Sequence, residues 1–135
     1  MQCPTCGEEF CARHFDSWWD PSKFDWQTKS SKLAIRCARH FPKWWNPDKF
    51  NWRDASGELA EYCSNYFDMW WDPDKFNWKA SWILAARCSK YFRKWWDPDR
   101  YDLRDYIYLV LYCSKYRYIW DKDVKLRRLL GVNNA

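Results

Sequence analysis

The N-terminal segment contains four side chains that could together bind one metal ion. Two cysteines are separated by two residues, and a third cysteine is followed three residues later by a histidine: Cys3, Cys6, Cys11 and His14. Thiolate sulfur and imidazole nitrogen are ligands that zinc prefers, and a structural zinc site takes four of them in a tetrahedron. A spacing of three residues would place Cys11 and His14 on one side of a helix. The segment therefore predicts one structural zinc ion bound by all four side chains.

The sequence CPTCG at residues 3–7 resembles the metal-binding knuckle of zinc ribbons. The resemblance implies a tight turn from which two thiolates point at one ion, with the glycine letting backbone amides face the sulfurs. It covers only residues 3–14 and lacks the second, distant knuckle of a zinc ribbon. There is also a rival interpretation, because CARHF recurs at residues 37–41. Cys11 and His14 would then be ordinary repeat residues, and Cys3 and Cys6 would lie in a loose tail.

Most of the chain consists of one motif that occurs four times, followed by a partial fifth copy. Its cysteines recur every 25 or 26 residues, at Cys11, Cys37, Cys63, Cys88 and Cys113. From the second copy on, a leucine precedes each cysteine by four residues, and in the first four copies a phenylalanine follows it by four. A Trp-Trp pair comes next, and then a segment such as DPDKFNW at residues 72–78. Such a period predicts a helical-repeat array, although 25–26 residues is short for a two-helix unit.

The spacing within each copy predicts two helices. Leu33, Cys37, Phe41 and Trp44 fall on one face of a helix, for which Ser30, Ser56 and Ser81 would be N-caps in successive copies. In the second copy Pro42 is expected to end or kink this helix by Phe41. Asp or Asn before proline is typical of a helix start, so each DPDKF-like segment predicts a second, short helix. We therefore expect an all-α fold. It would be a short, right-handed-type solenoid of about four two-helix units with an N-terminal zinc-knuckle cap and a C-terminal capping helix.

A length of 135 residues predicts a single domain, residues 1–135. Residues 1–14 would form the knuckle, 11–112 the four tandem repeats, and 113–135 the partial repeat and its cap. In the cap, Asp121 or Asp123 would start a short helix and Gly131 would end it. Val124, Leu126, Leu129 and Leu130 would form its apolar side. An alternative role for this helix is that of a docking or amphipathic surface segment.

The 13 tryptophans are expected to build the core rather than a binding surface. One unit has too few side chains to cover itself, so stacked units must share aromatic rings. The second Trp of each pair is predicted to be core, whereas the first lines a junction or lies on the surface. The repeat cysteines are predicted to pack as small apolar side chains, without disulfides between units.

Composition excludes several classes of function. With only 3 glycines and 2 histidines, the chain has no Gly-rich phosphate loop and no suggestive catalytic triad, so we do not expect an enzyme. The seven cysteines are an odd number, and the N-terminus does not have the pattern of a signal peptide. These features predict reduced thiols and an intracellular, cytoplasmic location. Charged residues make up 30% of the chain and its mean hydropathy is −0.83, so no membrane span is expected.

A binding function is therefore expected, and two classes of it are considered. The first class is interaction with a protein partner, which includes a structural role. A repeat array presents the same column of positions many times, and positions that vary on a constant frame could be tailored to a partner. The variable candidates are Asp16, Ser17, Pro42, Lys43, Asp68, Met69, Arg93 and Lys94.

The alternative class is binding of nucleic acid or a nucleotide. Two basic columns could track phosphates, helped by a net charge of +5 and by stacking of bases on exposed tryptophans. The first column contains Arg13, Arg39, Lys90 and Lys115, and the second contains Lys23, Lys49, Lys75 and Arg100. Acidic neighbours such as Asp48, Asp74 and Asp99 would reduce the positive charge along such a column.

Overall fold

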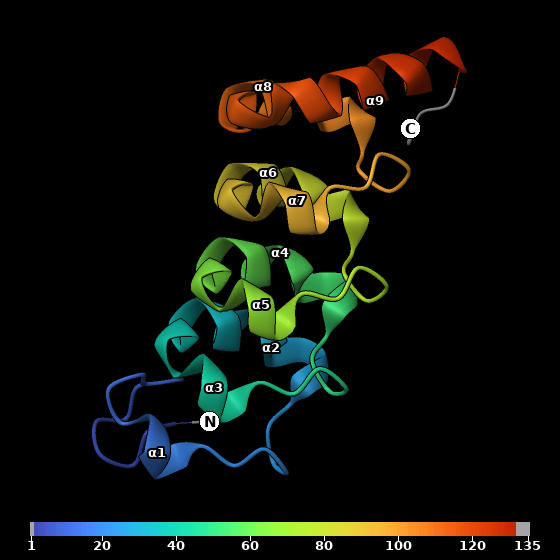
Figure 1. The fold of residues 1–135 in the computed structure, drawn as a ribbon. Helices are drawn as coiled ribbons and strands as arrows, with labels where there is room; N and C mark the ends of the chain where they lie inside the picture. Colours follow the sequence, from blue (N-terminus) through green and yellow to red (C-terminus); the bar gives the residue numbers. More distant parts are fainter. Residues whose placement is uncertain (1, 132–135) are drawn as a thin grey trace. The chain divides into compact units, whose positions relative to one another are not determined.

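The computed structural model describes residues 2–131, and the regular elements in that range are all helices, as expected (Figure 1). The α-helices are α1 Phe15–Trp18, α2 Trp26–Arg36, α3 Phe41–Trp44, α4 Trp52–Tyr62, α5 Phe67–Trp70, α6 Ser81–Arg87, α7 Phe92–Trp95, α8 Tyr106–Tyr112 and α9 Arg117–Leu129. Short 3₁₀ helices span Ala38–His40, Ser64–Tyr66, Trp78–Ala80, Ser89–Tyr91, Leu103–Asp105 and Ser114–Tyr116. Met1 and residues 132–135, the last part of the predicted cap, lie outside the described residues.

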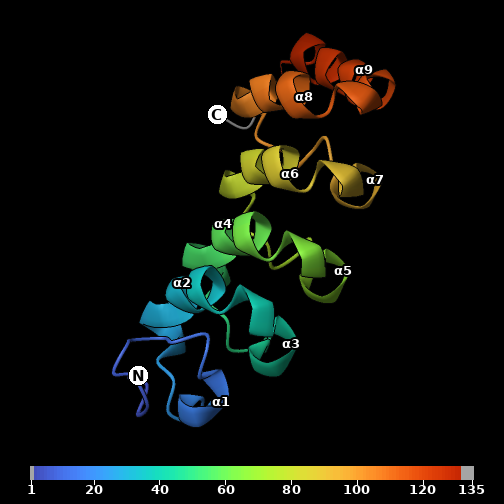
Figure 2. The same ribbon diagram turned by 90° about the vertical axis from the view of Figure 1, so that its left-hand side faces the viewer.

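The chain divides into two compact units, Met1–Asp72 and Pro73–Ala135. In the first unit α2 packs against α4, and in the second α6 packs against α8 (Figures 1 and 2). None of the helices in residues 2–131 combines the length and the apolar character that a membrane span requires.

The N-caps of the longer helices are not the predicted serines. In α2 the side chain of Asp25 accepts a hydrogen bond from the Thr28 amide, and in α4 the side chain of Asn51 accepts one from the Asp54 amide. These helices therefore begin one turn earlier than predicted, and Ser30 lies inside α2, where it is buried. The prediction was wrong because the Asp or Asn that follows each DPDKF-like segment is also a strong cap and comes first along the chain.

The DPDKF-like segments are turns, so the prediction of a short helix there was wrong. The side chain of Asp20 accepts a hydrogen bond from the amide of Ser22, two residues on, at 3.0 Å. Asp97 does the same with the amide of Asp99 at 2.9 Å. This contact closes an Asx-turn, which competes with an N-cap for the same side-chain oxygen.

The predicted first helix of the second copy, with its expected end or kink by Phe41, ends earlier, before its cysteine. Helix α2 ends at Arg36, and Cys37 leaves the helical region with φ −119° and ψ 27°. One 3₁₀ turn follows, and α3 then begins at Phe41. In each of the first four copies the short α-helix thus runs from the phenylalanine to the first Trp of the pair.

The first tryptophan of each pair is core, which reverses the predicted order. Trp18, Trp44, Trp70 and Trp95 are buried, and each indole N–H donates to the carbonyl of the cysteine seven residues earlier at 2.8 Å. The second tryptophan is only half-buried. In α3, for example, Trp45 is the C-cap, and its extended backbone places the ring outside Phe41, on which it stacks at 5.0 Å. The prediction assumed that the helix continues through both rings, whereas it ends between them.

Neighbouring copies within a unit are joined by the same three contacts. Phe41 is stacked between Trp45 and Tyr66, and Phe92 is stacked between Trp96 and Tyr116. The hydroxyl of Ser30 accepts from the Asn51 amide, and that of Ser81 accepts from the Asp102 amide, both at 3.1 Å. Finally, the thiols of Cys63 and Cys113 donate to the carbonyls of Ala34 and Ala85. The repeat cysteines are buried and form no disulfide, in agreement with their predicted packing role.

Helix α9 begins at Arg117, earlier than the predicted start at Asp121 or Asp123. Trp120 donates to the Cys113 carbonyl at 2.9 Å, so this helix continues the fifth copy instead of starting anew. Val124 is buried, but the other predicted apolar positions, Leu126, Leu129 and Leu130, are exposed. Gly131 follows the helix with φ +71°, a conformation that suits glycine and ends the helix as predicted.

Candidate metal centre

Residues 2–9 fold into a tight turn that carries Cys3 and Cys6. The amide of Cys3 donates to the Glu8 carbonyl at 2.9 Å, and the amide of Gly7 donates back to the Cys3 carbonyl at 2.8 Å. Gly7 has φ +74°, a left-handed conformation that residues with a Cβ rarely adopt. This turn points both sulfurs toward the chain that follows.

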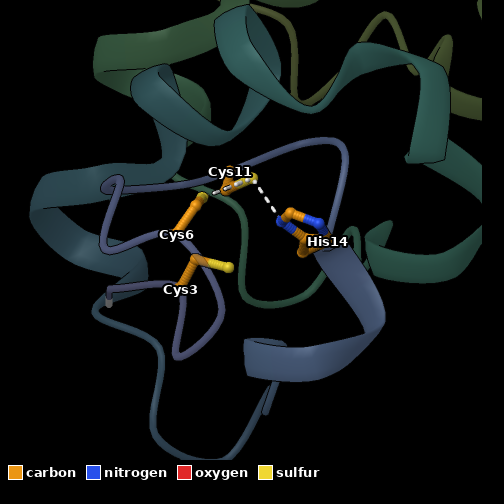
Figure 3. Close-up of side chains that lie close together, drawn as sticks. All are labelled: Cys3, Cys6, Cys11 and His14. Atoms are coloured by element: carbon orange, nitrogen blue, oxygen red, sulfur yellow. Dashed lines mark hydrogen bonds between the residues drawn. The ribbon is translucent and has the colours of Figure 1, made fainter.

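Cys3, Cys6, Cys11 and His14 come together, with their ligand atoms all within 4.8 Å of one another (Figure 3). The sulfurs of Cys6 and Cys11 are 3.4 Å apart, and Nδ1 of His14 lies 3.5 Å from the Cys11 sulfur. Tetrahedral zinc, with its usual bond lengths, needs sulfur–sulfur edges of about 3.8 Å and sulfur–nitrogen edges of about 3.6 Å. These two distances are close to those edges, and the four side chains could hold a metal ion.

The cysteine and histidine of the second pair do not share a helix face, contrary to the spacing argument. Cys11 lies in the loop before α1, and His14 is the N-cap residue of that helix. The two side chains still meet, because the loop turns back toward the knuckle (Figure 3). Cys3 and Cys11 are buried, His14 is half-buried and Cys6 is exposed.

Hydrogen bonds favour the thiolate form of one ligand. Burial raises the pKa of Cys3, but hydrogen bonds from the backbone of Cys6 and Thr5, with smaller ones from side chains, outweigh it and lower this pKa to about 6. For Cys6, a backbone hydrogen bond at Glu8 lowers the pKa, but burial and the thiols of Cys11 and Cys3 raise it overall. A thiolate at Cys3 beside neighbouring thiols is a setting that a divalent cation would stabilise.

The loop between the knuckle and α1 is held by three consecutive carbonyl groups. The carbonyl of Phe10 accepts from the Cys37 thiol at 3.6 Å, that of Cys11 accepts from the Trp18 indole at 2.8 Å, and that of Ala12 lies 2.7 Å from Nε2 of His40. Phe10 is buried with φ +53°, a conformation that is uncommon for a side chain of this size. The loop that carries Cys11 is thus fixed to α1, to the C-cap residue of α2 and to the 3₁₀ turn that follows it.

Three thiols and one imidazole would fill all four positions of a tetrahedral ion. Such a closed set leaves no position for a substrate, so the chemistry that it supports is structural. Of the acidic residues between the ligands, Glu9 forms an ion pair with Lys32 at 3.4 Å.

The eight residues predicted to bind a protein partner are all exposed. They are the middle residues of the four short helices: Asp16 and Ser17 in α1, Pro42 and Lys43 in α3, Asp68 and Met69 in α5, and Arg93 and Lys94 in α7. Lys43 forms an ion pair with Asp16 at 2.9 Å, so two positions of this column contact each other in the first unit. In the second unit, Arg93 lies over the rings of Tyr116 and Tyr118.

The residues of both basic columns are exposed as well. They are Arg13, Arg39, Lys90 and Lys115 in the first column, and Lys23, Lys49, Lys75 and Arg100 in the second. Arg100 is neutralised by Asp74 and Asp97, at 3.1 and 3.5 Å. In the second unit, Lys90 and Lys115 line one open depression, together with Ser89, Tyr112 and Tyr116.

Two residues near the candidate metal centre were not predicted to belong to it. Ser17, assigned to the partner-binding column, lies with its hydroxyl 3.7 Å from the Cys3 sulfur and donates to the His14 carbonyl at 2.6 Å. Its spacing of three residues from His14 could have indicated this. Phe10 had no signal in the sequence, because its role depends on its carbonyl group.

Comparisons of the chain with protein-family models, with curated proteins and with solved structures find no match.

Proposed function

We propose that the chain is a non-enzymatic helical-repeat protein that binds a protein partner through the exposed column of its short helices. In this proposal the copies stack as a short, right-handed-type solenoid of about four units. One structural zinc ion, held by Cys3, Cys6, Cys11 and His14, closes its N-terminal end. The cysteines, none of which forms a disulfide in residues 2–131, favour a reducing compartment such as the cytoplasm.

The observation that carries this proposal is the contrast between neighbouring positions of the short helices. The phenylalanine and the first tryptophan of α1, α3, α5 and α7 are buried in every copy, whereas the two residues between them are exposed and differ from copy to copy. A constant buried frame with variable exposed side chains is typical of repeat proteins that recognise a partner.

A charge exchange tests this column without changing its net charge. Asp16→Lys combined with Lys43→Asp keeps an ion pair between α1 and α3 but inverts the pattern that a partner would meet. The matched control is Asp121→Lys with Lys125→Asp, which inverts an ion pair of 3.0 Å on α9.

The two exchanges are compared with the unchanged chain in capture from a nuclease-treated lysate, followed by mass spectrometry. We expect a protein that is retained by the unchanged chain and by the control but lost with the α1–α3 exchange. If all three chains retain the same proteins, this column is not the binding surface.

A second candidate function is binding of single-stranded nucleic acid. It is favoured by the depression in the second unit, because Lys90 and Lys115 lie there beside the rings of Tyr112 and Tyr116. Cations can contact phosphates while aromatic rings stack on bases. Both lysines also lie over tyrosine rings, Lys90 at 5.0 Å from Tyr91 and Lys115 at 5.6 Å from Tyr116, which is a local alternative for their charges.

Titration of a fluorescent single-stranded oligonucleotide at several salt concentrations separates these alternatives. Lys90→Ala with Lys115→Ala should weaken binding and reduce the slope of log K against log salt by about 1–2. Lys122→Ala with Lys125→Ala removes the same charge from α9 and serves as the control. Equal weakening by both pairs would mean that only net charge matters, and no binding by the unchanged chain would eliminate this function.

A further inference from the structure

Three cations of the second unit lie around one aromatic ring, that of Tyr116. The guanidinium of Arg93 is 6.0 Å from the centre of this ring, and the ammonium of Lys115 is 5.6 Å from it. Lys90 lines the same open depression as Lys115, Tyr112 and Tyr116. We call Lys90, Arg93 and Lys115 the basic patch. It connects α7 with the 3₁₀ turns that precede α7 and α9.

Within residues 2–131, no carboxylate pairs with the basic patch. Its three side chains are exposed, and none of them forms an ion pair with another described residue. The segments that carry them, residues 87–96 and 106–120, contain no Asp or Glu. The first unit differs, because Lys43 of the short-helix column pairs there with Asp16 at 2.9 Å. The second unit therefore presents positive charge that a partner could neutralise.

The guanidinium of Arg93 is held in place before any partner binds. It lies over the rings of Tyr116 and Tyr118, and it donates a hydrogen bond to the Tyr118 hydroxyl. Because a side chain that is already ordered loses less conformational entropy on binding, these contacts favour recognition. A guanidinium has five N–H donors, so others remain for a carboxylate, which it binds through two parallel hydrogen bonds.

The rings beside the patch are poorly suited to stacking on nucleic-acid bases. Tyr116 stacks on Phe92 with a centroid distance of 4.8 Å and nearly parallel planes, and the patch cations lie over the same ring. Tyr91 has Lys90 and Lys94 over its ring, at 5.0 and 5.7 Å. Binding of single strands relies on aromatic faces that are open to bases. A ligand that offers negative charge alone therefore suits this surface better.

Acidic residues flank the patch in the sequence. Asp97 and Asp99 follow α7, and Asp121 and Asp123 lie on α9. The uncompensated charge is therefore limited to a few cations. A segment with a few carboxylates matches it, whereas a long phosphate backbone would extend past those acids.

We propose that the basic patch binds an acidic segment of the protein partner, in which Asp or Glu carboxylates pair with Lys90, Arg93 and Lys115. This inference rests on the proposed partner binding, and it names the chemistry that the partner presents to the second unit. Ion pairs at an exposed surface each contribute modestly and are screened by salt. For the acidic segment alone we therefore expect a Kd on the order of 100 µM at low salt, weakening as salt is added.

Fluorescence anisotropy of a labelled peptide with about six glutamates, titrated with the purified chain at several salt concentrations, tests this proposal. The same peptide with glutamine at those positions is the uncharged probe, and an oligothymidine of equal charge is the nucleic-acid probe. Arg93→Gln with Lys115→Gln removes two charges from the patch. The matched control, Lys122→Gln with Lys125→Gln, removes two charges from exposed positions of α9.

We expect the glutamate peptide to bind and the glutamine peptide not to bind. The patch variant should weaken binding about tenfold and the control about twofold or less, both with unchanged circular dichroism. The proposal is overturned if the glutamate peptide does not bind, if both variants weaken it equally, or if oligothymidine binds more tightly than the peptide. These outcomes concern the second unit alone. The proposed partner binding fails by a different result, namely capture of the same proteins after the α1–α3 exchange.

Discussion

The thiol of Cys37 donates to the backbone carbonyl of Phe10 at 3.6 Å, and this contact repeats one that joins successive copies of the motif. Cys63 contacts the Ala34 carbonyl at 3.8 Å, and Cys113 contacts the Ala85 carbonyl at 3.7 Å. In those pairs the acceptor lies on a helix, whereas Phe10 lies in the loop after the knuckle. The loop after the knuckle therefore supplies to the end of α2 the contact that a preceding helix supplies elsewhere.

Loss of the metal should weaken the helix that this loop contacts. Cys3→Ser combined with Cys6→Ser should reduce the metal content of the purified protein from about one ion to none. Because a metal that binds only the folded state stabilises it, we expect the first unit to lose about 3 kcal/mol or more. Elemental analysis measures the metal, and hydrogen exchange should show faster exchange in α2 with no change in α8.

The control for this experiment is Glu8→Gln with Glu9→Gln, which changes two acidic residues of the same loop but no ligand. It should keep the metal. Protein that is free of metal as purified, yet equally protected in α2, would refute the structural role of the site.

The serine inside α2 should matter more than its neighbour in the sequence. Ser30 is buried, donates to the Trp26 carbonyl at 2.6 Å and accepts from the Asn51 amide at 3.1 Å. Ser30→Ala leaves that amide without its acceptor and should cost about 1–3 kcal/mol in the free energy of unfolding. Ser31→Ala, at the adjacent half-buried position, should change it by about 0.5 kcal/mol or less. Urea denaturation measures both, and equal values would show that the contact contributes nothing.

The two rings of a Trp pair should differ in their contribution to stability. Trp44 is 2% exposed and donates to the Cys37 carbonyl, whereas Trp45 is half-buried at the end of α3. Trp44→Phe removes a buried hydrogen bond and leaves a cavity, so we expect a loss of about 2–3 kcal/mol. Trp45→Phe should cost about 1 kcal/mol less. The ranking is checked by denaturant unfolding followed by circular dichroism, and the opposite order would contradict the assignment of the core ring.

Alkaline pH should destabilise the fold through its buried thiols. Burial raises the pKa of Cys37 to about 11 and those of Cys63, Cys88 and Cys113 to about 12, from an ordinary value of 9.0. The folded form keeps these protons to a higher pH than the unfolded form does. The contribution of the thiols to the free energy of unfolding is therefore complete below about pH 9 and is lost as the pH rises toward 12. Each thiol contributes a slope of up to about 1.4 kcal/mol per pH unit in that window.

Cys63→Ala isolates this effect from the titration of other groups. The free energy of unfolding is measured by urea titration between about pH 8 and about pH 10.5 for the unchanged chain and the variant. The variant should show the shallower decline, by the slope of one thiol. Parallel curves would mean that Cys63 ionises equally in both states.

The types and spacings of residues were enough to predict the helical class, the packing role of the repeat cysteines and the candidate ligands Cys3, Cys6, Cys11 and His14. These features are local or periodic. A CPTCG turn, a helical spacing and a recurring cysteine each depend on a few neighbouring residues, so they are visible in the sequence itself.

Tertiary structure decided which of several competing local signals prevailed. Asp25 and Ser30 are both good N-caps, and the turn at Asp20 competes with a helix start for the same side-chain oxygen. The choice depends on the partner each group finds, and Ser30 is needed to accept the Asn51 amide of the next copy. The order of the Trp rings was likewise settled by the Cys37 carbonyl, which is free to accept the Trp44 indole because α2 ends there. Phe10 is buried, whereas Ile107 and Leu111 of α8 are exposed, because the folded chain covers one and not the others. The spacing of residues within one chain segment carries no information about which surfaces become covered.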